Sequence, residues 1–195
     1  MSRLTNLADR LLRWLLPRVA GKRKPDLTIG PLADPYLCRW YVLPRNRLFN
    51  VYLHQFWRSD DDRALHDHPW WSLSWCLRGT MVEHTIAPGG IHRRQRVRAG
   101  DVRLRTARAA HRLEVEHGAA PVYTLFITGP RLRAWGFHCP AAGWVPWQRF
   151  VAGTDDASRG LIGPGCGDEP VPDDPSNDWR KFSRKLTPWK ERDHA

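Results

Sequence analysis

The chain has 195 residues, of which 42% are hydrophobic and 26% are charged, and its formal net charge is +11. This length suits one domain with appendages and is short for two, and the composition excludes wholesale disorder. No uninterrupted apolar run approaches the ~18 residues of a membrane-spanning helix, so we expect a soluble protein without a membrane partner.

The N-terminal segment has the spacing of an amphipathic helix over residues 3–16. Its apolar residues recur at intervals of three and four: Leu4, Leu7, Leu11, Trp14 and Leu15. Pro17 is expected to end the helix, and Arg13 makes the run a poor signal peptide, which predicts a cytoplasmic protein. A basic linker follows, so residues 1–35 are interpreted as a helix and linker that pack on the domain or on a partner in a homodimer.

Short runs rich in Val, Leu, Trp, Tyr and Phe, separated by turn signals, occupy residues 36–152. Nine strands are predicted, at 39–43, 48–57, 65–77, 80–87, 91–97, 101–106, 111–116, 122–128 and 133–138. Many short strands with no long helix between them predict an all-β antiparallel sandwich or barrel. Residues 153–195 are rich in Asp, Pro and Gly, and we expect an irregular C-terminal tail there.

The cysteines indicate the redox compartment of the protein, and its charge indicates possible partners. In a chain without a secretion signal, widely spaced cysteines favour free thiols over a disulfide framework. The four are Cys38, Cys76, Cys139 and Cys166. Basic clusters at residues 18–24 and 93–98 leave nucleic acid open as a partner, although scattered arginines explain the high net charge equally well.

The histidines carry the strongest functional signal. His66 and His68 are two residues apart, so on a strand both imidazoles point to the same face. Two neutral imidazoles, joined by a third from another strand, suit Fe, Mn, Ni, Cu or Zn. An isolated HxH pair is weak evidence for a metal site, so the sequence around it must decide whether a site is present.

These surroundings resemble the two motifs of the cupin family. Gly79 follows His66-Asp67-His68 at the spacing of the first motif, and Gly100 precedes His111 by the eleven positions of the second. The resemblance covers about residues 36–151 and implies a cupin-type antiparallel β-barrel, or jelly roll, with His66, His68 and His111 as metal ligands.

The departures from the motifs concern the fourth ligand. The glutamate of the first motif falls on Ser72, and Glu83 on the next predicted strand is a candidate substitute. The remaining motif residues are replaced by Asp60, Thr106, Arg108 and Val115. A three-histidine site without a carboxylate resembles the thiol dioxygenases and some ring-cleaving dioxygenases among the cupins.

The resemblance implies one divalent transition metal, Fe(II) first and Zn, Mn, Ni or Cu as alternatives. It implies a mononuclear dioxygenase or other oxidoreductase that acts on a small anionic molecule. One alternative is a non-catalytic binding or regulatory cupin that recognises a sugar or nucleotide through its tryptophans. The other is a nucleic-acid-associated protein that uses its basic arms. No catalytic side chain is assigned.

Alternation along residues 65–77 predicts which side chains line the pocket, although Pro69 introduces a bulge. The candidates on this strand are Trp70, Ser72, Ser74 and Cys76, and His54 on the predicted strand 48–57 is a separate candidate for the same interior. His138 is a weak candidate for a fourth ligand. Residues 60–62, three successive aspartates, are interpreted as a solvated loop rather than a cation site.

Overall fold

A computed structural model describes residues 3–21, 23–30, 34–60, 64–116, 120–151 and 164–167. The elements are α1 (Arg3–Leu15), the π-helical turn η1 (Leu16–Ala20), β1 (Leu27–Ile29), β2 (Leu37–Tyr41), β3 (Asn50–Phe56), β4 (Leu65–His66), β5 (Ser72–Arg78), β6 (Thr80–Ala87), β7 (Ile91–Arg98), β8 (Val102–Arg105), β9 (Arg112–Glu114), β10 (Val122–Thr128), β11 (Gly136–Cys139), β12 (Gly143–Pro146) and α2 (Trp147–Phe150). The expected tail lies outside the described residues except for 164–167.

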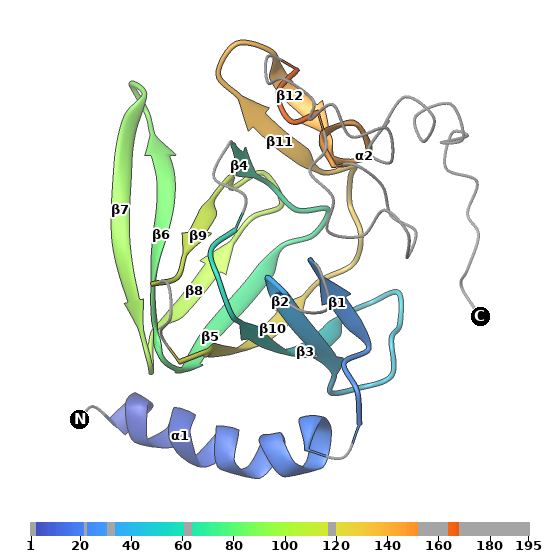
Figure 1. Cartoon of the computed structure of the whole chain (residues 1–195), viewed down its shortest axis with the longest axis vertical. Helices are drawn as coiled ribbons and strands as arrows, with labels where there is room; N and C mark the ends of the chain where they lie inside the picture. The colour runs from blue at the N-terminus through green and yellow to red at the C-terminus, as the bar shows by residue number, and fades with distance from the viewer. Residues whose placement is uncertain are drawn as a thin grey trace.

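The strands form three antiparallel sheets (Figure 1). The largest has the order β1-β2-β3-β10-β5-β8, and the others are β7-β6-β9 and β12-β11-β4. We call β4–β6 the first half of the jelly roll and β8–β10 the second half. The two halves interleave, since β5 lies between β8 and β10 and β6 pairs with β9. This interleaving is a jelly roll, so the predicted all-β, cupin-type fold is confirmed. The described strands remain three separate sheets, however, and do not close into one barrel.

Helix α1 covers the outer face of the six-stranded sheet, below β5 in Figure 1. Its buried residues are Ala8, Leu12 and Leu15, and they pack against Trp40 and Leu53. The predicted helix is therefore present, but two expectations are wrong. Pro17 does not end the helical path, because the chain continues through η1 to Ala20, with Pro17 at the start of that turn, where a missing N–H costs least. The expected linker also contains β1.

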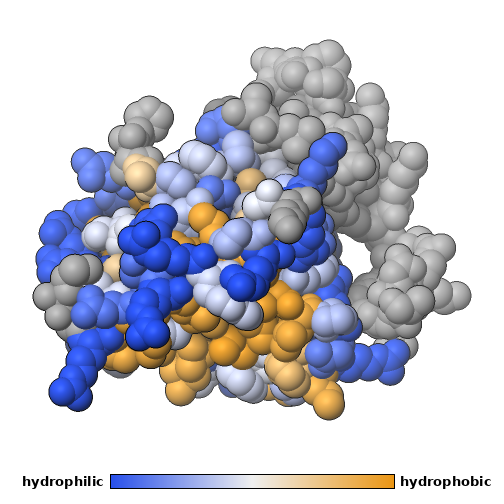
Figure 2. All heavy atoms as spheres, turned by 90° about the horizontal axis from the view of Figure 1, so that it is seen from below, coloured by the Kyte–Doolittle hydropathy of each residue, from blue (hydrophilic) through white to orange (hydrophobic). Residues whose placement is uncertain are grey.

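Only part of the predicted apolar stripe of α1 faces the core, where Leu15 is buried and Leu11 packs against the same cluster. Leu4, Leu7 and Trp14 are about half exposed, at 53%, 50% and 54%. On the face of the sheet that α1 covers, apolar residues of β3, β10, β5 and β8 lie opposite one another in the strand register. This row ends at the exposed Leu104. Figure 2, seen from the side of α1, shows apolar side chains gathered there between charged ones. No described helix is long and apolar enough to cross a membrane.

One pair of cysteines contradicts the expectation of four thiols. Cys139 on β11 and Cys166 form a disulfide, whereas Cys38 and Cys76 are buried free thiols. Spacing along the chain could not reveal this pair, because 27 positions separate its members. The bond joins residues 164–167 to β11, beside the small cluster of Phe137 and Phe150.

We expect Cys139→Ser to lower the free energy of unfolding by ~2–4 kcal/mol, since the disulfide closes a loop of moderate length. Urea denaturation with and without reductant measures this difference. Cys166→Ser is the matched control and should have the same effect, and neither variant should respond to reductant. An unchanged midpoint in both variants would contradict the assignment.

Candidate metal centre

The three histidines meet where the two halves of the jelly roll are joined. The predicted strand 65–77 is interrupted around Pro69, so that His66 ends β4 and His68 lies just beyond it. His66 and His111 form an isolated antiparallel bridge, and each backbone N–H donates to the other carbonyl oxygen at 2.9 Å. Backbone pairing therefore places the histidine of the second motif beside the pair of the first.

The imidazoles converge closely enough to hold one ion. One ligand nitrogen from each of His66, His68 and His111 lies within 4.8 Å of the others, the only such His, Cys, Asp or Glu cluster among the residues described. Nε2 of His68 and Nε2 of His111 are 2.9 Å apart. Two nitrogens at right angles around one ion, each about 2.1 Å from it, would be about 3.0 Å apart. The spacing therefore fits neighbouring ligand positions.

The other nitrogens of two of these rings face carboxylates. Nδ1 of His66 is 2.8 Å from Oδ2 of Asp60, and Nδ1 of His111 is 3.0 Å from Oε1 of Glu83. A carboxylate at Nδ1 holds the proton there and leaves the lone pair on Nε2 for a metal. Glu83 thus does not replace the missing glutamate as a ligand, and Asp60 is not part of a solvated loop. Residues 61 and 62 lie outside the described part of the chain.

Two arginines hold Glu83 in place. Arg105 Nε donates to Oε1 of Glu83 at 2.6 Å, and Arg103 Nε is 3.6 Å from Oε2. The side chains of Glu83 and Arg105 are 5% and 8% exposed, so this ion pair is shielded from water. Such a network fixes the carboxylate that orients His111.

Burial and neighbouring charges set the protonation of the cluster. Burial lowers the pKa of His68 and of His111 well below the ordinary value, and nearby cationic groups lower both further. For His66 burial also acts to lower the pKa, but the Asp60 carboxylate outweighs it and the net shift is upward. His68 and His111 are consequently neutral at pH 7, as metal ligands must be.

Asp67, between the two histidines, has a separate structural role that the sequence did not reveal. Its carboxylate accepts hydrogen bonds from Arg133 at 2.7 Å, from the Gly136 backbone at 2.9 Å and from Trp144 at 3.1 Å. His138 also contacts it, with Nε2 3.1 Å from Oδ2. His138 therefore lies outside the three-histidine group and is not a fourth ligand.

The predicted lining residues occupy two places. Ser72 and Ser74 are buried on the face of β5 that also bears Cys76, and the Trp70 ring stacks on His68 with centroids 6.4 Å apart. Cys76 packs in the core with Met81 and Val97, where burial raises its pKa to about 12. Its thiol is therefore not a nucleophile.

His54, the remaining predicted residue, lies on β3 and is 3% exposed. Its ring stacks on Phe126 at 4.9 Å, and the same phenylalanine ring is 6.1 Å from the ring of His68. Arg39 Nε donates to its Nε2 at 2.8 Å. The sequence did not single out Arg39, because its contact with His54 depends on the register between β2 and β3.

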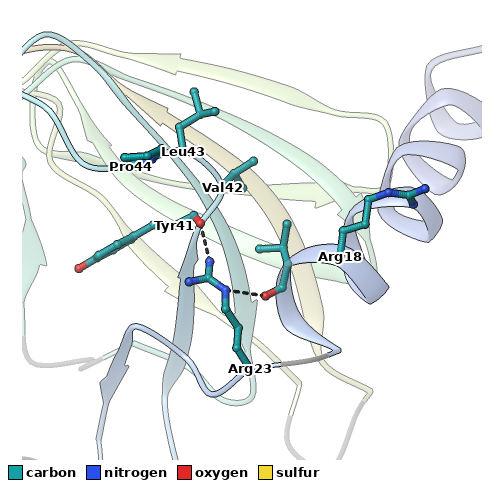
Figure 3. A pocket seen from close by; sticks show the side chains of 7 residues that line it. Arg18, Arg23, Tyr41, Val42, Leu43 and Pro44 are labelled. Atoms are coloured by element: carbon teal, nitrogen blue, oxygen red, sulfur yellow. Dashed lines mark hydrogen bonds between the residues drawn. The ribbon is translucent and has the colours of Figure 1, made fainter.

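An open surface hollow of about 410 Å³ lies elsewhere, between the end of η1 and the end of β2 (Figure 3). Arg23 at its edge is already engaged, because it donates to the carbonyl oxygens of Val19 and Tyr41 (Figure 3). Arg18 donates to the carbonyl oxygen of Trp14 and stacks on its ring. This hollow lies between the helical segment and the sheet, and none of the three histidines lines it.

No family model and no curated protein matches the sequence. Among solved structures, the chain is similar to oxalate decarboxylase from Bacillus subtilis, at 18% identity and a TM-score of 0.45, over 69% of this chain and 32% of that one. It therefore spans about a third of that protein. FeII HppE gives 11% identity and a TM-score of 0.44, over 54% and 56% of the two chains. A double-stranded β-helix protein from Klebsiella pneumoniae gives 18% and 0.42, over 56% and 90%.

Proposed function

Starting from a chain of cupin-type fold, we propose that His66, His68 and His111 hold one divalent transition metal and that the protein is a metal-dependent oxidoreductase. The observation that supports this most strongly is the orientation of the rings. The facing Nε2 atoms of His68 and His111 are 2.9 Å apart, while Nδ1 of His66 and of His111 each face a carboxylate. The carboxylates at Nδ1 leave the Nε2 lone pairs of His66 and His111 available to an ion that Nε2 of His68 would also bind.

Fe(II) is the metal that we propose first, and Mn, Zn, Ni and Cu are alternatives. A bound Fe(II) would supply the electrons and the open coordination positions that O2 chemistry needs. A dioxygenase places both atoms of O2 in one substrate, so this reaction requires no separate reductant. Ser72, where the family has a glutamate, leaves the site without a fourth protein ligand.

The protein's own residues would bind and orient a small anionic substrate. Three neutral imidazoles leave the full charge of a divalent ion uncompensated, which favours an anion beside it. The Glu83 carboxylate orients His111, and the Trp70 ring beside His68 shields that imidazole from water. Positioning of this kind brings two reactants together without any covalent role for the chain.

The test combines metal analysis of untagged protein with oxygen uptake. Fe(II)-loaded protein is expected to consume O2 with a panel of small organic acids and not with their amides. Uptake is measured with an oxygen electrode, and Zn(II)-loaded protein serves as the control. Stoichiometric metal without any uptake would contradict the oxidoreductase and favour the non-catalytic binding protein.

A further inference from the structure

Arg39 on β2 is a partly buried cation without an acidic partner among the described residues. In the segments that the structure describes, no aspartate or glutamate forms an ion pair with it, and its contacts are His54 Nε2 at 2.8 Å and the Tyr52 ring at 4.7 Å. Arg105, by contrast, is paired with Glu83. An unpaired buried charge is costly, so a protein rarely keeps one unless a ligand supplies the counter-charge.

The hydrogen bond from Arg39 also fixes the proton of His54. An arginine can only donate, so His54 Nε2 must accept, and the neutral ring carries its proton on Nδ1. Burial lowers the pKa of His54 well below its ordinary value, which keeps the ring neutral. Nδ1 of His54 is buried, and it has no hydrogen-bond partner among the described residues. It is therefore an N–H donor that awaits an acceptor.

A second polar group stands next to this donor. Thr124 on β10 lies opposite His54 in the strand register, on the same face of the sheet. Its Oγ1 is buried and, within the described part of the chain, likewise lacks a partner. Buried polar groups are almost always hydrogen-bonded in native proteins. Two unsatisfied groups beside one unpaired arginine thus indicate a place for a polar ligand.

This place and the three histidines share one interior. The Phe126 ring contacts both sides, 4.9 Å from the ring of His54 and 6.1 Å from the ring of His68. A small molecule could therefore reach both groups across a single phenylalanine.

We propose that Arg39 and His54 bind the carboxylate of a small organic acid whose other end reaches the three-histidine group. Among the described residues the terminal guanidinium nitrogens of Arg39 make no hydrogen bond or ion pair, and a planar carboxylate can bridge them with two parallel hydrogen bonds. Nδ1–H of His54 is a third donor in the same interior. Arg39 is thus the residue that selects for anions. The link to the metal rests on the proposed function, whereas anion binding by Arg39 does not.

The first arm uses metal-free full-length protein with side-chain 15N-labelled arginine. Acetate and inorganic phosphate are titrated separately, and the Arg39 Nε–H resonance is followed by NMR. Acetate is expected to shift this resonance in a saturable way and to bind more tightly than phosphate. Arg39→Met should weaken acetate binding by about tenfold or more, and Arg39→Lys should recover part of it. Arg45→Met, which removes an exposed arginine from the neighbouring Tyr41 ring, is the matched control and should bind as wild type.

The second arm repeats the titration with Zn(II)-loaded protein and glycolate, an acid with a second oxygen donor. If Zn(II) raises the affinity of the protein for glycolate but not for acetate, this result supports a ligand that bridges Arg39 and the metal. Arg39-dependent acetate binding in a protein that fails to take up Zn(II) or Fe(II) when either is supplied would sink the proposed function and keep the anion site. Equal acetate affinity in wild type and Arg39→Met, or a phosphate preference, would overturn the carboxylate site.

Discussion

His111→Ala should reduce the bound metal from about one equivalent per chain to near zero, since three neutral nitrogens are the only protein ligands that we assign. His111 also contributes the backbone bridge to His66, which a substitution of the side chain leaves in place. The loss therefore concerns the ligand and not the pairing of the strands. Metal content is measured by elemental analysis after purification without a histidine tag.

His138→Ala is the matched control for this experiment. Its imidazole contacts Asp67 and lies outside the cluster, so metal content should remain at the wild-type level. Circular dichroism of both variants separates loss of metal from loss of fold. Full metal occupancy in His111→Ala, or equal loss in His138→Ala, would show that the ion is held elsewhere.

Glu83→Leu is expected to cost ~3–5 kcal/mol of unfolding free energy, because it leaves Arg105 buried without its counter-charge. The same change removes the acceptor for His111 Nδ1, so metal affinity should fall by roughly 10–100-fold. Urea denaturation of metal-free protein measures the first effect, and competition with a chelator measures the second.

Two further variants separate the causes. Glu83→Leu combined with Arg105→Met removes both charges, and stability should return close to wild type while metal affinity stays low. Glu114→Leu removes a carboxylate with 38% exposure that pairs with His84, and it should cost under about 1 kcal/mol. A double variant as unstable as Glu83→Leu would refute the unpaired charge as the cause.

Sequence patterns predicted well those features that depend on neighbouring residues. The strands at 80–87 and 122–128 agree with β6 and β10 to the residue, because Gly79 and the Pro-Gly-Gly turn bound the first of them sharply. The HxH pair was visible from spacing, whereas His111 was singled out by the resemblance to the second cupin motif, and the structure brings all three histidines together. The HxH pair was nevertheless placed on one long strand, and Pro69 divides that strand.

Features that depend on the packing of distant segments were not predictable in this way. The contacts of Asp60 with His66 and of Glu83 with His111 join separate elements, so no local pattern marks them. The buried face of α1 is another case. Its exposed leucines have the same helical spacing as its buried residues, and only the position of the sheet decides between the two. The partner of Cys139 likewise depends on the path of the chain.

The bridge between His66 and His111 would give an ion bound there a mechanical role in addition to the chemistry that we propose. These two residues join β4 of the first half to the start of β9 in the second, with a hydrogen bond in each direction. An ion held by both side chains would cross-link the halves at the same point as the backbone does. Local opening of this seam would then require release of the ion from at least one of the two side chains, so a bound ion would stabilise the closed seam.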